Sequence, residues 1–197
     1  MIPVLLSLAV LAGASAWELW PVFVNAVRCH AMTRPAVRIY NQGDLYLERF
    51  YILGRKSNHE IPDEDVRLAW LPTLWVHHFV RPDADRELHN HPWWWAVSVV
   101  LAGAYLEERE GHFTGWVPGG PVVVKVWRSR RVRWLNIILR RTWHRVAELD
   151  GDVWTLFMTG GKAGRWSFLV PARVIPWRQF VRDRENANQG SDPNTAR

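Results

Sequence analysis

The stretch RPDADRELHNHPWWW, residues 81–95, places two histidines, His89 and His91, at the start of an apolar run rich in strand-forming residues. Residues i and i+2 of a β-strand point to the same face of a sheet. The two imidazoles can therefore reach one point inside a β-structure, the smallest geometry that chelates a metal ion. Imidazole suits several transition metals, so the pair predicts a metal site without fixing the metal. The alternative is two ordinary histidines in a polar loop.

The composition describes one domain of ordinary size plus an appendage. Of the 197 residues 48% are hydrophobic and 14 are tryptophans, many of which must be buried because so many exposed indoles would make the surface adhesive. The one cysteine, Cys29, excludes an intramolecular disulfide and a cysteine-based zinc site, and it mildly favours a reducing compartment. The net charge of +6 suits nucleic acid, anionic lipid or acidic ligands, but it is a weak signal.

Residues 2–27, IPVLLSLAVLAGASAWELWPVFVNAV, form an apolar run with three interpretations. Its length suits a membrane anchor, which needs about 20 apolar residues, and the arginines from Arg28 onward would then place the domain in the cytoplasm. A signal peptide is the second interpretation, since ASA at 14–16 resembles a cleavage site, although no basic residue precedes the run. The third is a helix docked on the domain. We expect the anchor, and hence a membrane-associated protein; a soluble or exported protein is the alternative.

Short runs of β-branched and aromatic residues, separated by Gly, Pro and Asp turns, fill residues 36–181. Helical periodicity is almost absent, so the pattern predicts an all-β sandwich or barrel. Gly103 interrupts the longest run, which indicates a bulge or a close approach of two backbones. Residues 182–197 are polar and predict a disordered tail. The expected strands are 36–53 (a hairpin), 67–80, 93–106, 122–127, 142–149, 153–158 and 166–170.

Residues next to the histidine pair are candidates to support it. His77 and His78 end an expected strand, and only one of them can face inward because neighbours point to opposite faces; His77 is our candidate. Asp83 and Asp85 lead into the pair and could hold the ligand imidazoles in one tautomer. The alternative roles are structural: a hydrogen-bonded core histidine, or solvated carboxylates in local arginine pairs that contribute about 0–1 kcal/mol each.

A basic cluster lies between the expected strands of the second half of the chain. It comprises Arg128, Arg130, Arg131, Arg133, Arg140, Arg141 and Arg145. Arginines next to tryptophans could bind single-stranded nucleic acid by phosphate contacts and base stacking. A solvated basic face is the more common role of such a cluster, so nucleic acid is not the partner that we expect.

The motifs together resemble the cupin superfamily. Cupins carry His-x-His, a glutamate four or five residues later, a glycine, and a single histidine in a second motif. Here residues 89–91 and Gly103 fit the first motif and His144 fits the second, whereas the glutamate position falls on residues 95–96, Trp and Ala. More closely, the chain resembles a group of small bacterial and phage cupin-like proteins. The motifs of that group lie at residues 46–51, 77–79, 83–93, 144–146, 154–160 and 166–168, with Ser167 in place of a glycine.

The resemblance implies a double-stranded β-helix of the jelly-roll type with a divalent metal, which could be iron, zinc, manganese or nickel. The implied ligands are His89, His91 and His144. Glu148, which shares a strand face with His144, and Glu107 are candidates to replace the absent glutamate.

Three functions remain open from the sequence. The first is a metal-dependent enzyme acting on a small molecule, since three-His cupin sites resemble those of thiol and diketone dioxygenases; Tyr105 and Glu107 are its candidate acid–base residues. The second is a non-enzymatic β-barrel that binds a ligand or partner. The third is nucleic-acid binding through the basic cluster. Contact with a membrane through residues 2–27 and formation of a homodimer are further expectations.

Overall fold

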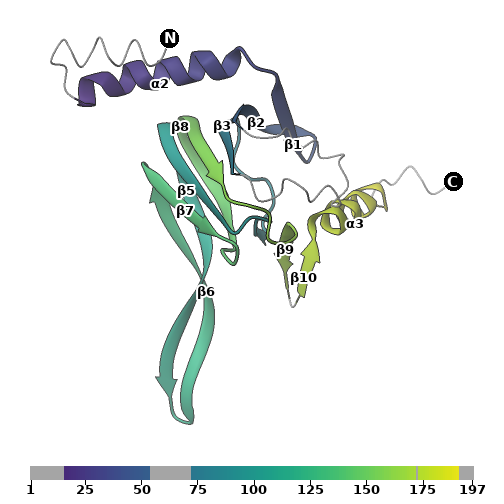
Figure 1. Cartoon of the computed structure of the whole chain (residues 1–197). Coiled ribbons are helices and arrows are strands. Elements are labelled where there is room, and N and C mark those ends of the chain that lie inside the picture. The colour runs from purple at the N-terminus through teal and green to yellow at the C-terminus, as the bar shows by residue number, and fades with distance from the viewer. Residues whose placement is uncertain (1–15, 54–71, 172, 191–197) are drawn as a thin grey trace.

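The computed structural model describes residues 16–53, 72–171 and 173–190 (Figure 1). The helices of the described residues are α2 (Ala16–Met32) and α3 (Trp177–Gly190). The strands are β1 (Ala36–Asn41), β2 (Asp44–Leu53), β3 (Thr73–Phe79), β4 (Leu88–His89), β5 (Trp95–Val117), β6 (Gly120–Val132), β7 (Leu135–Leu139), β8 (His144–Thr159), β9 (Ser167–Val170) and β10 (Arg173–Pro176).

The strands form one antiparallel sheet that curls into a half-barrel (Figure 1). Its order is β1-β2-β3-β8-β4-β9-β10, and β5 joins it by pairing with β8 while also carrying β6 and β7. The outer half of β5 and β6 continue beyond the sheet as a long hairpin. This arrangement confirms the predicted all-β fold, and the N-terminal helix that we predicted is present as α2.

Strand β8 lies at the centre of the sheet, with β5 along one side and with β3 and then β4 along the other. Residues 153–159 pair with β3 on one side, and residues 154–159 pair with β5 on the other. At the opposite end, His144 pairs with His89 of the two-residue strand β4 and with Arg109 of β5. The register therefore brings the first histidine of the pair directly opposite the distant His144.

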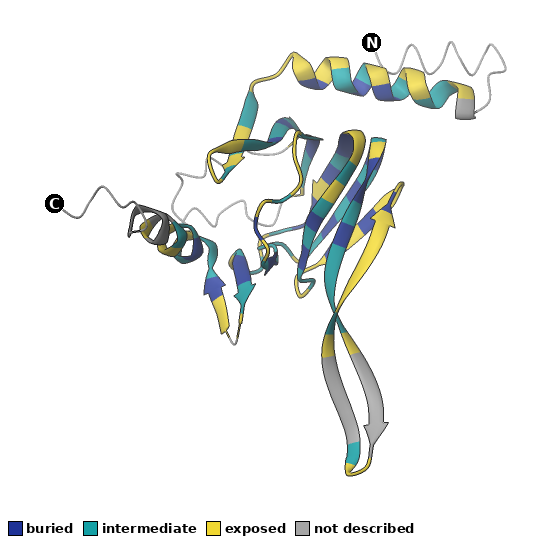
Figure 2. Cartoon of the chain, turned by 180° about the vertical axis from the view of Figure 1, so that it is seen from behind, coloured by how far each residue is buried: buried dark blue, intermediate teal, exposed yellow. Residues whose placement is uncertain are grey.

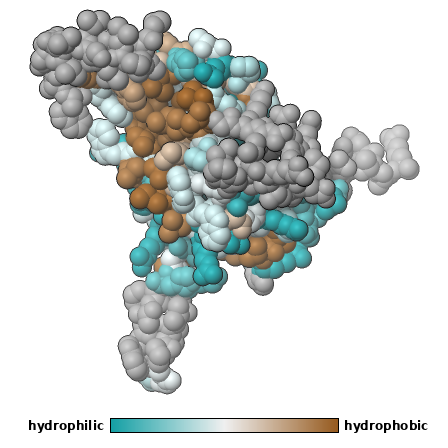
Figure 3. Space-filling model, in the orientation of Figure 1, coloured by the Kyte–Doolittle hydropathy of each residue, from teal (hydrophilic) through white to brown (hydrophobic). Residues whose placement is uncertain are grey.

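Helix α2 packs across the outer face of the sheet. Val24, Val27 and Ala31 turn inward and join a buried cluster with Phe50 and Trp154 of the sheet. Figure 2 shows that the buried positions of α2 face the strands, and Figure 3 shows hydrophobic side chains gathered beneath it. This is the docked position that we considered as one of three alternatives for residues 2–27.

The membrane-anchor prediction stays a prediction, because residues 1–15 lie outside the described residues. Over the part of the chain that the structure describes, no helix combines the length and the apolar character needed to cross a membrane. Helix α2 also runs to Met32, five residues beyond the expected end of the segment at 27.

The C-terminal tail differs from the prediction. We expected disorder from residue 182, but helix α3 continues to Gly190. Phe180 of this helix stacks on Phe168 of β9 with ring centroids 4.1 Å apart, and both are buried with Ile175. Trp177 and the ion pair of Arg184 with Asp85 also hold the helix in place, and the part of the prediction that concerns residues 191–197 lies outside the described residues.

Gly103 marks the irregularity that its position predicted. The β5–β8 register shifts on both sides of it, and its φ of 68° lies in the left-handed region that favours glycine. A Cβ at this position would approach the backbone oxygens of Asp152 and Asp150 to 2.9 and 3.0 Å.

We therefore expect Gly103→Ala to lower the free energy of unfolding by about 2–5 kcal/mol, combining backbone strain with a steric clash. Gly43→Ala is the matched control, since Gly43 also has a positive φ of 86° but has nothing within 4 Å of an added Cβ. The Gly43→Ala variant should lose only the free energy that comes from backbone strain, about 1–2 kcal/mol. Urea unfolding of the two variants measures the difference, and equal losses would contradict the close approach.

Candidate metal centre

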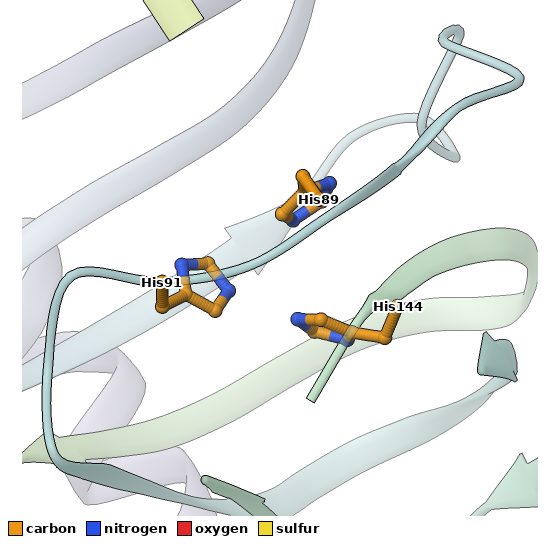
Figure 4. Close-up of side chains that lie close together, drawn as sticks. All are labelled: His89, His91 and His144. Atoms are coloured by element: carbon orange, nitrogen blue, oxygen red, sulfur yellow. The ribbon is translucent and has the colours of Figure 1, made fainter. Parts of the chain in front are cut away.

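Three histidines from two distant segments converge on the concave side of the sheet. His89 ends β4, His91 follows it, and His144 begins β8. One ring nitrogen from each residue lies within 4.8 Å of the other two, and the ring centroids are 5.0 to 5.1 Å apart. Figure 4 shows the three rings pointing toward a common space. The i, i+2 geometry of the pair and the β4–β8 register together produce this convergence.

The buried carboxylate of Glu107 fixes the proton of His144. Nδ1 of His144 lies 2.7 Å from Oε1 of Glu107, whose side chain is fully buried. Because a carboxylate only accepts hydrogen bonds, Nδ1 carries the proton and Nε2 keeps a lone pair. Nε2 of His144 is buried and has no hydrogen-bond partner among the described residues. A buried acceptor without a partner is rare in a folded protein, and a metal ion would satisfy it.

Glu107 is held in turn by a dense polar network. Oε2 accepts hydrogen bonds from Nε of Arg109 and Nε of Arg130, each 2.8 Å away, and Oε1 accepts one from Asn136 Nδ2 at 2.9 Å. Burial raises the pKa of Glu107, but hydrogen bonds from His144, Arg109 and Asn136 outweigh it and hold the pKa well below the ordinary value. The carboxylate is thus a fixed negative charge directly behind His144.

The electrostatics keep His91 and His144 in the form that binds metal. Burial lowers the pKa of His91 well below its usual range, and the neighbouring His144 and His89 lower it further. Burial also lowers the pKa of His144, in spite of the opposing hydrogen bond to Glu107. Neutral imidazole is the ligand form, so both rings offer a lone pair at neutral pH.

Asp83 lies behind His89, where the sequence placed it. Its Oδ2 is 3.3 Å from Nδ1 of His89, close enough for an ion pair although the alignment is too poor for a hydrogen bond. The backbone N–H of Asp83 donates to the carbonyl of Val146, and Asn41 Nδ2 donates to Asp83 Oδ1 at 3.0 Å. Asp83 thus places a carboxylate beside Nδ1 of His89, without a hydrogen bond between them.

The other two predicted supporting residues make different contacts. Asp85 lies further from the histidines than Asp83 does. It accepts a hydrogen bond from Asn41 and forms an ion pair with Arg184 of α3. His77 faces the concave side, as predicted, but it accepts a hydrogen bond from Arg49 and stacks on Phe157 at 4.6 Å. Among the described residues, neither side chain contacts the three histidines.

Glu148 does not join the cluster. It is exposed, whereas His144 and Val146 are buried. Leu106 pairs with Glu148 but Glu107 pairs with Val146, so β8 has one extra residue at this point. A bulge of this kind reverses which face the following residues occupy, and it turns Glu148 outward.

Tyr105, the other candidate acid–base residue, lies in the core. It is buried in a cluster with Val100, Val132 and Val153, and its hydroxyl accepts a hydrogen bond from Asn136 at 2.8 Å. Burial and the nearby Glu107 raise the pKa of Tyr105 to about 12, so it stays protonated. Its contacts are those of a residue that supports the Glu107 network.

Sequence reasoning missed the remaining members of that network, Asn136, Arg109 and Arg130. Asn136 gave a signal, because a polar residue within the otherwise apolar strand LNIIL predicts a specific buried partner. The two arginines gave no such signal in the sequence, and Arg130 was therefore counted only as a member of the basic cluster. That cluster is partly neutralised, since Arg130, Arg131 and Arg145 pair with Glu107, Asp150 and Glu108.

The donor set fits a divalent transition metal. Three neutral imidazole nitrogens suit zinc, iron and nickel, whereas calcium and magnesium prefer oxygen ligands. Nitrogen–metal bonds are about 2.0–2.1 Å for zinc, so a small contraction of the cluster places one ion within reach of all three rings. Three protein ligands leave coordination positions open, which is typical of catalytic rather than structural sites.

Comparison with known proteins adds a fold similarity. No protein-family model matches the chain, and no curated protein matches it. Among solved structures, the fold is similar to that of Fe(II)-HppE, crystallised with the alternative substrate (S)-1-HPP. The TM-score is 0.41 and the identity 11%, over 66% of this chain and 57% of that one. The chain thus spans just over half the length of HppE, and the resemblance to the bacterial and phage group stays a prediction.

Proposed function

We propose that the protein is a metal-dependent enzyme that acts on a small molecule, and that an oxygenase reaction is the specific form to test first. The observation that supports it best is the convergence of three imidazoles, one of which has a buried lone pair without a partner. A structural role for the histidines alone does not account for that lone pair.

The residues have distinct roles in this proposal. The ion is bound by ring nitrogens of His89, His91 and His144. Glu107 lies behind His144 and orients its ring, and Asp83 lies behind His89. When bound, a divalent ion supplies open coordination positions for a substrate and, if it is iron, redox chemistry. Trp93 and Trp166 stack beside His91, with ring centroids at 5.0 and 6.4 Å, and limit the access of water.

Elemental analysis of the purified full-length protein tests the proposal. We expect about one equivalent of iron, zinc, manganese or nickel per chain, and loss of most of it in His91→Ala. The bound ion stabilises the folded state, so a chelator should lower the melting temperature; removing an ion present at 100 times its dissociation constant costs about 2.7 kcal/mol.

His112→Ala is the matched control, because His112 is an exposed histidine of β5. It should retain the full metal content and the full chelator effect. A protein that contains no metal after reconstitution with each of the four ions, and whose melting temperature ignores chelator, would contradict the proposal. The non-enzymatic ligand-binding or partner-binding module would then be the better description.

A further inference from the structure

Arg49 brings a positive charge to the concave side of the sheet, near the three histidines. It lies in β2 directly opposite His77 of β3, and His77 lies opposite Thr155 of β8. Residues that pair directly across antiparallel strands share a face, so these side chains line one wall. The guanidinium rests on the ring of Trp75, 4.5 Å from its centroid, and Nε donates to Nε2 of His77 at 3.2 Å.

The charge of Arg49 has no carboxylate partner among the described residues. The neighbouring Arg38 pairs with Glu48 at 3.1 Å, and Arg109 pairs with Glu107. The described contacts of Arg49 are instead His77, Trp75 and a hydrogen bond with Tyr51, which use only part of its N–H donors. Arg49 is half-buried, and partial burial of a guanidinium without a counter-charge is costly, which favours the binding of an anion.

Other unpaired polar atoms lie on the same wall. Trp75 Nε1 and Thr155 Oγ1 are buried and have no hydrogen-bond partner among the described residues, and the residues are 3% and 0% exposed. The indole N–H is only a donor, and the hydroxyl can donate. Together with Arg49 they offer three kinds of donor to an acceptor that the described chain does not supply.

The wall is one aromatic layer away from the metal centre. Trp75 contacts Trp93 with ring centroids 5.4 Å apart, and Trp93 stacks on His91 at 5.0 Å.

We propose that Arg49 forms the anion-binding end of the substrate site, so that the substrate is a small organic anion with a carboxylate or phosphate-type headgroup. The proposal rests on the proposed function, in that the other end of the substrate faces the metal. Guanidinium binds such oxyanions with two parallel N–H···O bonds, and the stack on Trp75 holds its plane in place.

Titration of the full-length protein with three isosteric probes tests this: propionate, ethylphosphonate and the uncharged propionamide, followed by ligand-observed NMR. We expect at least one anion to bind at least about tenfold more tightly than the amide, and Arg49→Met to remove that preference. The stronger of propionate and ethylphosphonate identifies the headgroup. Arg49→Lys should retain only part of the affinity, because lysine keeps the charge but loses the two-pronged geometry.

Arg38→Met is the matched control, since Arg38 lies in the neighbouring strand β1, on the opposite face of the hairpin from Arg49, with its side chain 61% exposed. It should bind the anions as well as the parent protein. Equal binding of anion and amide, or unchanged anion binding in both folded Arg49 variants, would overturn the proposal. Metal content measured on the same samples separates the two ideas: Arg49-dependent anion binding without metal supports the subsite and contradicts the metal-dependent function.

Discussion

Replacing Glu107 by glutamine should weaken both the fold and the metal site. Glutamine keeps the shape of the side chain, but it has one carbonyl oxygen in place of two carboxylate oxygens and adds an NH₂ group that faces donors. Arg109 and Arg130 then lose their counter-charge. Breaking a buried pair costs about 3–5 kcal/mol, and the 44% exposure of Arg130 places the loss near the lower end because water can replace one partner.

The same substitution should lower metal affinity by about 10–100-fold, which is typical when the group behind a ligating histidine is removed. Competition with a chromophoric chelator, measured well below the melting temperature, separates this effect from the loss of stability. Glu108→Gln is the matched control: it removes an adjacent carboxylate paired with Arg145 at 2.7 Å, and it should cost about 1 kcal/mol or less. Unchanged metal affinity in a folded Glu107→Gln protein would show that Glu107 does not position His144.

Trp154→Ala should produce the largest loss of packing. Trp154 is 3% exposed, stacks between Phe50 at 6.0 Å and His78 at 4.3 Å, and carries the guanidinium of Arg28 from α2 on its ring. Truncating a buried tryptophan costs about 3–5 kcal/mol. We expect a loss of this size in denaturant unfolding, together with faster proteolysis of α2, because Trp154 belongs to the buried cluster against which the helix packs.

Trp127→Ala supplies the control for this second change. Trp127 is 57% exposed at the base of the β5–β6 hairpin, so its removal should alter stability by about 0.5 kcal/mol or less. A loss below about 1 kcal/mol for Trp154→Ala would mean that α2 and the outer face of the sheet do not unfold with the rest of the protein.

The residues of the metal site were predictable where local geometry decides them. The spacing of His89 and His91 fixes their common direction, and the cupin resemblance located His144. The identity of Glu107 as the residue behind His144 required the register of β5 on β8, where Arg109 lies opposite His144 and Glu107 two residues away on the same face. No pattern within one strand reveals that pairing.

The bulge in β8 explains why counting along the strand misplaced Glu148. Alternation predicts that His144, Val146 and Glu148 share a face, and it holds only up to the extra residue between Val146 and Glu148. Gly103, in contrast, did indicate an irregularity from the sequence, because a glycine inside an apolar strand often marks a bulge or a close approach of two backbones. Arg49 was not singled out, since its surroundings come from β3 rather than from its own strand.

The ion pair between Arg184 and Asp85 has a practical consequence for anyone who trims the protein. A shortened version that ends before residue 184 looks harmless on the printed sequence, yet it removes the cation from a carboxylate with a side chain only 7% exposed. Asp85 shares Asn41 with Asp83, which stands behind His89. Deleting the last fourteen residues should therefore disturb the carboxylate that lies behind His89, although the deletion is far from this histidine in the sequence.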